Sequence, residues 1–178
     1  MSTHDLFGDT IARRRAMGSH QSQVGGKDEW LTPPELIREL GPFDLDPCAP
    51  IRRPWDTATE HYTIQDDGLN QRWHGFVWCN PPYAHVGKWM ARMAEHGNGI
   101  ALLFARTETK AWHEHIWPKA SSVLFLKGRL TFYHVDGTPG ASNSGAPSAL
   151  IGYGMGAARR LSRAANSLGK CVRLEVSE

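Results

Sequence analysis

Residues 77–90, VWCNPPYAHVGKWM, run from an apolar segment into an asparagine, two prolines and a tyrosine. Because proline cannot donate to a sheet ladder, Pro81 and Pro82 should end a strand and hold the following backbone in a nearly fixed conformation. Asn80 and Tyr83 would then stand on a rigid support at the carboxyl end of that strand. Ligands of open α/β sheets bind at this end, so an amide, a fixed carbonyl and an aromatic ring meet where chemistry is expected.

Strands and helices alternate along the chain that must position these residues. Apolar and β-branched runs predict strands over residues 43–50, 75–82, 99–106, 121–133 and 148–154. Helical patterns are predicted over residues 33–40, 87–97 and 109–120. Continuous apolar strands that alternate with helices are typical of a parallel or mixed sheet covered on both faces.

The start of the first helix carries a complete N-terminal signal. Thr32 is expected to cap it, Pro33 suits its first turn, and Glu35 completes a T-x-x-E capping box. A helix start also offers unpaired N–H groups to a carboxylate, so a ligand contact can accompany the structural role.

The composition is that of one globular domain with a polar N-terminal arm. The 178 residues are 40% hydrophobic and 21% charged, so residues 28–178 are predicted to form a single domain with one core. Residues 1–27 are polar and include three consecutive arginines, so a flexible arm is expected there. The sequence has no apolar run of the length needed for a membrane span or a signal peptide, so a cytoplasmic protein without a membrane partner is expected.

Neither the cysteines nor the histidines have the spacing of metal ligands. Cys48, Cys79 and Cys171 are odd in number and are expected to be reduced thiols. His113 and His115 lie two residues apart, which on a helix directs them to different faces, so no metal site is expected. The formal net charge of +2 permits nucleic-acid binding without requiring it.

Seven segments follow one another in a characteristic order. They are DEWLTPPEL, FDLDPCAP, DDGL, W-x-G-x-V-W-x-N-P-P-Y, ARTET with WHEHIWPKA, FLKGRLTF and APSALIGYG. This ordered set resembles the phage-type DNA N6-adenine methyltransferase (Dam) family over roughly residues 20–155. The resemblance implies a compact α/β, Rossmann-like S-adenosylmethionine-dependent methyltransferase fold with a mixed sheet. It also implies S-adenosylmethionine as cofactor, DNA as partner and action in the host cell of a phage or prophage, while the oligomeric state stays open.

The resemblance assigns Asn80, Pro81, Pro82 and Tyr83 to catalysis. The adenine amine is a poor nucleophile because its lone pair is delocalised into the ring. The Asn80 side-chain oxygen and the Pro81 backbone carbonyl can accept the two N–H bonds and localise that lone pair. Tyr83 would stack on an adenine taken out of the duplex.

The segment FDLDPCAP implies a donor-binding role for four consecutive residues: Asp46, Pro47, Cys48 and Ala49. Related enzymes often continue with a glycine-rich turn that lets the backbone approach the ligand closely. Pro50 stands at that place in this sequence, so this edge of the pocket is expected to be built differently.

Two further segments are expected near the donor. DDGL, residues 66–69, makes Asp67, in preference to Asp66, a candidate for the acid beside the donor adenine, although these letters alone are typical of a turn. The backbone from Trp30 to Thr32 is implied to contact the donor from the side opposite Asp46.

DNA contacts are expected from basic residues outside the catalytic segment. Arg106 ends a strand at the same edge as Asn80, and Lys127 and Arg129 belong to the segment LKGRL. Further candidates are residues 134–147, the arginines of the N-terminal arm and RRLSR at residues 159–163. Contacts to phosphates give affinity without reading bases, so loose sequence specificity is expected.

Two other functions are compatible with these residues. Two acceptors that face an exocyclic amine would also serve N4 of cytosine or adenine in RNA, although Asn rather than Ser before Pro-Pro-Tyr favours adenine. A non-catalytic DNA-binding protein that keeps the same fold is the second alternative, and Pro50 is the residue that argues for it.

Overall fold

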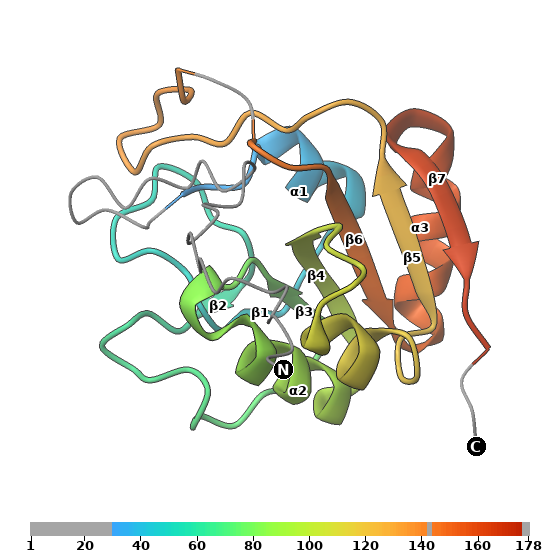
Figure 1. The fold of residues 1–178 in the computed structure, drawn as a ribbon. Helices are drawn as coiled ribbons and strands as arrows, with labels where there is room; N and C mark the ends of the chain where they lie inside the picture. The colour runs from blue at the N-terminus through green and yellow to red at the C-terminus, as the bar shows by residue number, and fades with distance from the viewer. Residues whose placement is uncertain (1–29, 142–143, 176–178) are drawn as a thin grey trace, which may run out of the picture.

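A computed structural model describes residues 30–141 and 144–175, and the arm predicted at residues 1–27 lies outside them. The described residues form one sheet of seven strands in the order β2-β1-β3-β4-β6-β5-β7 (Figure 1). The strands are β1 Leu45–Asp46, β2 Glu60–His61, β3 Val77–Cys79, β4 Gly99–Phe104, β5 Ser122–Leu126, β6 Ser148–Tyr153 and β7 Gly169–Arg173. The helices are α1 Pro34–Leu40, α2 Val86–His96 and α3 Gly154–Leu168, with the short turns η1 Tyr83–His85 and η2 Trp112–Ile116.

The sheet is mixed, as the sequence predicts. Strands β2, β1, β3 and β4 are parallel, and β6 runs antiparallel to both of its neighbours, β4 and β5. Strand β5 therefore runs in the same direction as β4. Strand β7, at the end of the sheet, pairs antiparallel with β5. The carboxyl ends of five strands therefore lie on the same side of the sheet, which we call the carboxyl edge. These strands are β1, β2, β3, β4 and β5.

Helices cover both faces of the sheet. Successive strand residues alternate between the two faces, so Val77 and Cys79 pack towards α2 and η2, whereas Trp78 between them packs towards α1 and α3. The apolar residues of α3 recur three and four positions apart, at Ala157, Leu161 and Ala164. Among the described residues, no helix has both the length and the apolar character that a membrane crossing needs.

The predicted capping box at the first helix is wrong. Helix α1 begins at Pro34 with Pro33 as its N-cap, and no side chain caps it. The extended backbone of Pro33 moves the helix start past the reach of the Thr32 hydroxyl, and the backbone N–H of Leu36 bonds to the Pro33 carbonyl instead. Glu35 pairs with Arg38 at 3.2 Å rather than with the helix start.

Two predicted elements differ from the prediction in a way that the backbone explains. The strand predicted over residues 121–133 ends at Leu126, because the chain turns at Gly128 with a φ of 79°. The helix predicted over residues 109–120 contains a wider turn, η2, in which the Trp117 N–H bonds to the Trp112 carbonyl. Strands β2 and β7 and helix α3 have no counterpart in the sequence prediction.

Candidate active site

The carboxyl ends of β1 and β3 lie side by side at the centre of the carboxyl edge. The chain leaves β1 towards β2 on one side and leaves β3 towards β4 on the other. Adjacent strands whose connections diverge in this way create a crevice outside the sheet, where ligands of α/β proteins bind. Asp46 is the last residue of β1, and Asn80 directly follows β3.

Cys48 joins the two strand ends. Its sulfur lies 3.8 Å from the sulfur of Cys79. Both sulfurs belong to free thiols. The segments that the sequence predicts for the donor and for the base are therefore in direct contact.

The Asn80 side chain is half-buried, and its amide nitrogen is directed into the protein. Nδ2 donates to the Thr32 hydroxyl at 3.3 Å and to the Trp30 carbonyl at 3.5 Å. Pro81 is buried and Pro82 is exposed, so the two prolines anchor the segment on one side and leave it open on the other.

The ring of Tyr83 is held against the end of β4. It stacks on Phe104 with 4.6 Å between ring centroids and 19° between ring planes. The hydroxyl accepts the backbone N–H of Phe104 at 2.9 Å, and burial raises the pKa of the phenol above its usual range. Sequence reasoning missed Phe104, although its place as the last aromatic residue of an apolar strand at this edge was a signal.

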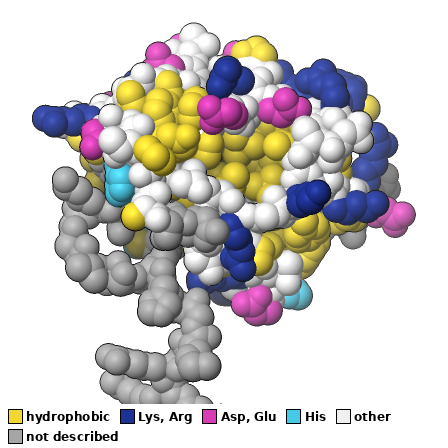
Figure 2. All heavy atoms as spheres, turned by 90° about the horizontal axis from the view of Figure 1, so that it is seen from above, with side chains coloured by type: hydrophobic (Ala, Val, Ile, Leu, Met, Phe, Trp, Pro, Cys, Tyr) yellow, Lys and Arg dark blue, Asp and Glu magenta, His cyan; other side chains and the backbone are white. Residues whose placement is uncertain are grey.

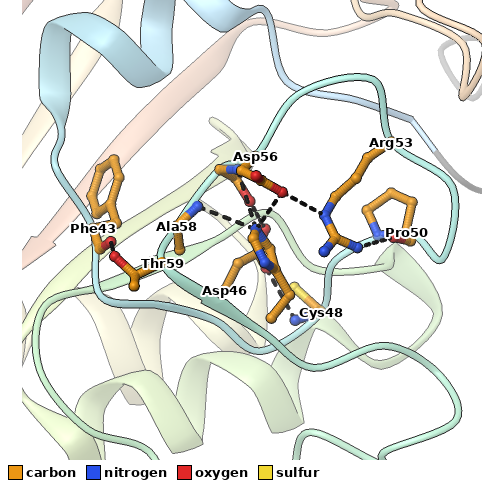
Figure 3. A network of polar contacts seen from close by, with 10 residues as sticks. Phe43, Asp46, Cys48, Pro50, Arg53, Asp56, Ala58 and Thr59 are labelled. Carbon is orange, nitrogen blue, oxygen red and sulfur yellow. Dashed lines mark hydrogen bonds and ion pairs between the residues drawn. The ribbon is translucent and has the colours of Figure 1, made fainter.

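Asp46 is buried, with 3% of its surface exposed, and both carboxylate oxygens are engaged (Figure 3). Oδ1 accepts the backbone N–H of Cys48 at 3.1 Å, and Oδ2 accepts the hydroxyl of Thr57. Burial raises the pKa of Asp46 to about 6, and these two hydrogen bonds offset part of that rise. The side chain therefore fixes the turn that follows β1. Thr57 was not among the predicted residues.

The loop after this turn is braced by polar groups that replace a glycine-rich turn. Arg53 donates to the Pro50 carbonyl at 3.1 Å and pairs with Asp56 at 3.3 Å (Figure 3). Nε2 of His61 accepts the backbone N–H groups of Thr57 and Ala58, each at 3.3 Å. Burial, helped by the charge of Arg53, lowers the pKa of His61, which favours the neutral imidazole that these bonds need.

We predict that the stability of Asp46→Asn relative to the wild type increases as the pH rises from acidic to neutral. Because the folded pKa of about 6 exceeds the ordinary 3.8, the folded state holds an extra proton between these values, and the buried charge costs stability above them. Unfolding free energies from urea titrations should show the variant gaining about 2 kcal/mol on the wild type between pH 4 and pH 7. Glu175→Gln, at an exposed carboxyl, is the control and should not give this slope. If the unfolding free energies of wild type and Asp46→Asn change in parallel with pH, the raised pKa of Asp46 is contradicted.

The turn at residues 66–69 follows β2 and packs against the turn that follows β1. A Cβ on Gly68 would lie 1.9 Å from the Pro47 carbonyl oxygen, so only glycine permits this contact. Asp67 has a φ of 51° and accepts the side-chain amide of Asn70 at 2.7 Å. Asp66 accepts the N–H and hydroxyl of Thr63, which lower its pKa. Both carboxylates are exposed beside the crevice.

Aromatic residues from three segments pack around the Trp30–Thr32 segment, which contacts Asn80. Leu31 and Tyr133 exchange two backbone hydrogen bonds, which bring the segment after β5 to the Trp30–Thr32 segment. The 42% exposed Trp30 packs on His134 with 4.8 Å between rings, and Trp55 packs edge-on against Tyr133 and donates to the Thr32 carbonyl. The sequence prediction named Trp30 alone among these aromatic side chains.

The predicted DNA-contacting residues lie at the carboxyl edge. Arg106 is exposed after β4, with its guanidinium 5.6 Å from the Phe104 ring, and Lys127 and Arg129 are exposed after β5. The view onto this side in Figure 2 shows apolar side chains at the centre, with Lys and Arg as well as Asp and Glu side chains around them.

In the segment RRLSR of α3, Arg160 is engaged within the protein, whereas Arg159 and Arg163 are exposed. Arg160 donates to the carbonyls of Leu40 and Pro42 at 2.9 and 2.7 Å and covers the Phe76 ring at 4.1 Å, so it joins α3 to the end of α1. Leu161 is buried in the core. The arginines at residues 13–15 lie outside the described residues.

Fold and site together define a Rossmann-like α/β protein whose sheet has its switch point between β1 and β3, with an Asn-Pro-Pro-Tyr segment directly after β3. The sequence profile of the DNA N-6-adenine-methyltransferase (Dam) family matches residues 19–154, and the chain belongs to this family. Comparisons with curated proteins and with solved structures gave no significant match. The protein is therefore a DNA adenine methyltransferase that uses S-adenosylmethionine, and the predicted family, fold, activity and cofactor are confirmed.

The described residues fit this cofactor. Asp66 and Asp67 carry exposed carboxylates in the segment after β2, and a carboxylate can accept hydrogen bonds from the polar groups of a bound donor. The close turn at Gly68 keeps them beside the residues that follow β1.

Proposed function

We propose that Asn80, Pro81 and Tyr83 hold the target adenine on one side of the crevice, with Pro82 fixing the backbone between them. The observation that carries the proposal is the contact between the last residue of β3, which directly precedes this segment, and the turn after β1, through the sulfurs of Cys79 and Cys48 at 3.8 Å. A base-holding segment and a donor-holding turn at one switch point bring the two reactants within reach of each other.

The residues of this chain would act by placing hydrogen-bond acceptors around the amine. Oδ1 of Asn80 and the Pro81 carbonyl would accept the two N–H bonds, which directs the lone pair away from the ring plane. Positive charge develops on the amine as it attacks, and these preorganised oxygens stabilise that charge. S-adenosylmethionine, when bound, supplies an electrophilic methyl group on a positively charged sulfur. An amide oxygen is too weak a base to retain a proton, so the proton lost by the amine would pass to water.

The donor would be held by residues from three segments: Trp30 and Thr32 through their backbone, Asp46, Pro47, Cys48 and Ala49 after β1, and Asp67 after β2. Asp46 would act indirectly, because its two oxygens hold the Cys48 N–H and the Thr57 hydroxyl. Its contribution would be the shape of the turn rather than a contact with the donor.

The domain that carries out this reaction would extend over residues 28–178. Helix α3 and strand β7 follow the matched part of the chain, yet α3 packs on the sheet and β7 pairs with β5. We propose the cytoplasm as the place of action, because DNA and the methyl donor meet there.

DNA would be bound by Arg106, Lys127 and Arg129 through phosphates. We predict that Lys127→Gln and Arg129→Gln each weaken binding equally for all sequences and reduce the slope of log K against log salt by about 1. Fluorescence anisotropy with labelled duplexes at several salt concentrations measures both effects. Arg173→Gln, at an exposed arginine beside the start of β5, is the control and should leave the slope unchanged. An equal loss with Arg173→Gln would contradict the proposed phosphate contacts of Lys127 and Arg129.

The reaction itself can be tested by nucleoside mass spectrometry after incubation with S-adenosylmethionine and duplex DNA. N6-methyladenine is expected, and EDTA should not change the yield because the proposed residues act without a metal. N4-methylcytosine, or methylation of RNA alone, would support the related amine methyltransferases. Donor binding in calorimetry without any methylated product would support a non-catalytic DNA-binding protein.

A further inference from the structure

The Thr32 hydroxyl has a partner that its place before a helix does not explain. The residue is 2% exposed, it caps no helix, and its Oγ1 lies 3.3 Å from Nδ2 of Asn80. We infer that Thr32 is a positioning residue that sets which end of the Asn80 carboxamide faces the adenine. This inference rests on the proposed role of Asn80.

The second partner of Asn80 identifies the end that faces the protein. The Trp30 carbonyl, 3.5 Å from the same nitrogen, can only accept a hydrogen bond. The carboxamide must therefore turn its NH₂ group towards Trp30 and Thr32. Within residues 30–141 and 144–175 no donor bonds to Oδ1 of Asn80, which leaves that oxygen for a ligand.

The opposite orientation would prevent the reaction. A flipped Asn80 would place Oδ1 against the Trp30 carbonyl, oxygen to oxygen, and would present N–H groups to the N–H groups of adenine. Asparagine cannot correct this by losing a proton, so the orientation has to be imposed by neighbours. Thr32 and Trp30 impose it together.

The same bonds also strengthen the acceptor. An amide whose N–H groups donate to other oxygens is polarised, and its own oxygen becomes more negative. Oδ1 of Asn80 is then a better acceptor for the adenine amine. Thr32 itself is held in place, because its carbonyl accepts the indole N–H of Trp55 at 3.2 Å.

Two substitutions separate the hydroxyl from the shape of Thr32. Thr32→Val keeps the volume and removes the acceptor, and it should lower kcat about 10-fold, the effect of losing one hydrogen bond. KM for DNA and the Kd of S-adenosylmethionine should stay within about 2-fold, because Oγ1 is turned to Asn80. Thr32→Ser keeps the hydroxyl and should recover most of the lost kcat.

A variant of Asn80 provides the matched background. Asn80→Asp has an acceptor oxygen at both ends of the side chain, so the orientation no longer matters. Adding Thr32→Val to Asn80→Asp should therefore change kcat less than about 2-fold. The changes in kcat caused by the two single substitutions should not add in the double variant. An equal loss in both backgrounds would overturn the inference, as would a Thr32→Val enzyme with wild-type kcat or with weakened donor binding alone.

Nuclear magnetic resonance tests the orientation without relying on activity. The side-chain NH₂ protons of Asn80, identified by their loss in Asn80→Asp, should exchange slowly with solvent in the wild type and faster in Thr32→Val. Fast exchange in the wild type would overturn the inference, even if Thr32→Val does not fold. If the Asn80 NH₂ protons exchange slowly but the protein methylates no substrate, the inferred orientation of Asn80 is supported and the proposed function is rejected.

Discussion

Replacing Asn80 with alanine should lower kcat by about 10²–10³-fold, the loss that follows removal of one preorganised group that stabilises transition-state charge. The affinity for S-adenosylmethionine should stay within a few-fold, because the side chain is proposed to hold the amine and not the donor. Single-turnover methylation measures the rate, and calorimetry measures donor affinity. An enzyme with near-wild-type turnover would remove Asn80 from the site.

Asn80→Asp is the matched control for this substitution. It keeps the size of the side chain and an acceptor oxygen, and it replaces the NH₂ group that faces Thr32 and Trp30 with a second oxygen that shares a negative charge. Its kcat should lie clearly above that of Asn80→Ala. Equal losses in the two variants would indicate that the amide nitrogen, rather than the oxygen, is what the reaction requires.

Truncating Tyr83 should produce the second large effect. Base stacking on an aromatic ring contributes roughly 1–3 kcal/mol, so Tyr83→Ala should lower kcat/KM by about 5- to 150-fold. Tyr83→Phe should lose much less, because the ring remains. The phenylalanine variant should instead lower Tm by several degrees, because the Phe104 N–H loses its acceptor.

Binding to mismatched DNA tests whether the ring holds an extruded base. Extrusion costs a few kcal/mol of unpairing, so a mismatch opposite the target adenine should tighten binding by the wild type. The gain should shrink in Tyr83→Ala, with salt held constant for all duplexes. If wild type binds both duplexes equally and Tyr83→Ala loses nothing, Asn80–Tyr83 does not hold a flipped base.

The position of the candidate site could be predicted because local rules determine it. Prolines end strands, and parallel strands bring their ends to one edge, so Asn80, Asp46 and Arg106 were expected at the same edge. The order of the motifs along the chain added the family, which no single motif could indicate.

The contacts inside the site depend on distant parts of the chain. Thr32 reaches Asn80 across 48 residues, and Leu31 meets Tyr133 across 102 residues. A T-x-x-E pattern predicts a local hydrogen bond. A long-range partner of Thr32 such as Asn80 cannot be detected from the spacing of residues along the chain. The partner of Asp46, Thr57, lies in a loop without periodicity, so no pattern indicated it.

Elements near the end of the chain were missed for a different reason. Helix α3 contains two glycines and several arginines, and its apolar face consists largely of alanine, which gives a weak periodic signal. Strand β7 has a single large aliphatic residue, Val172, and depends on pairing with β5. Such segments acquire their structure from the sheet that they join.

The antiparallel strand β6 controls the order in which the sheet can be completed during synthesis. It lies between β4 and β5, yet it comes after both in the chain. Until residues 148–153 have left the ribosome, β4 exposes one row of backbone groups and β5 has no partner on either side. A chain cut before residue 148 would therefore lack the middle of its sheet and be prone to aggregation, whereas a tag added after residue 178 leaves that middle intact.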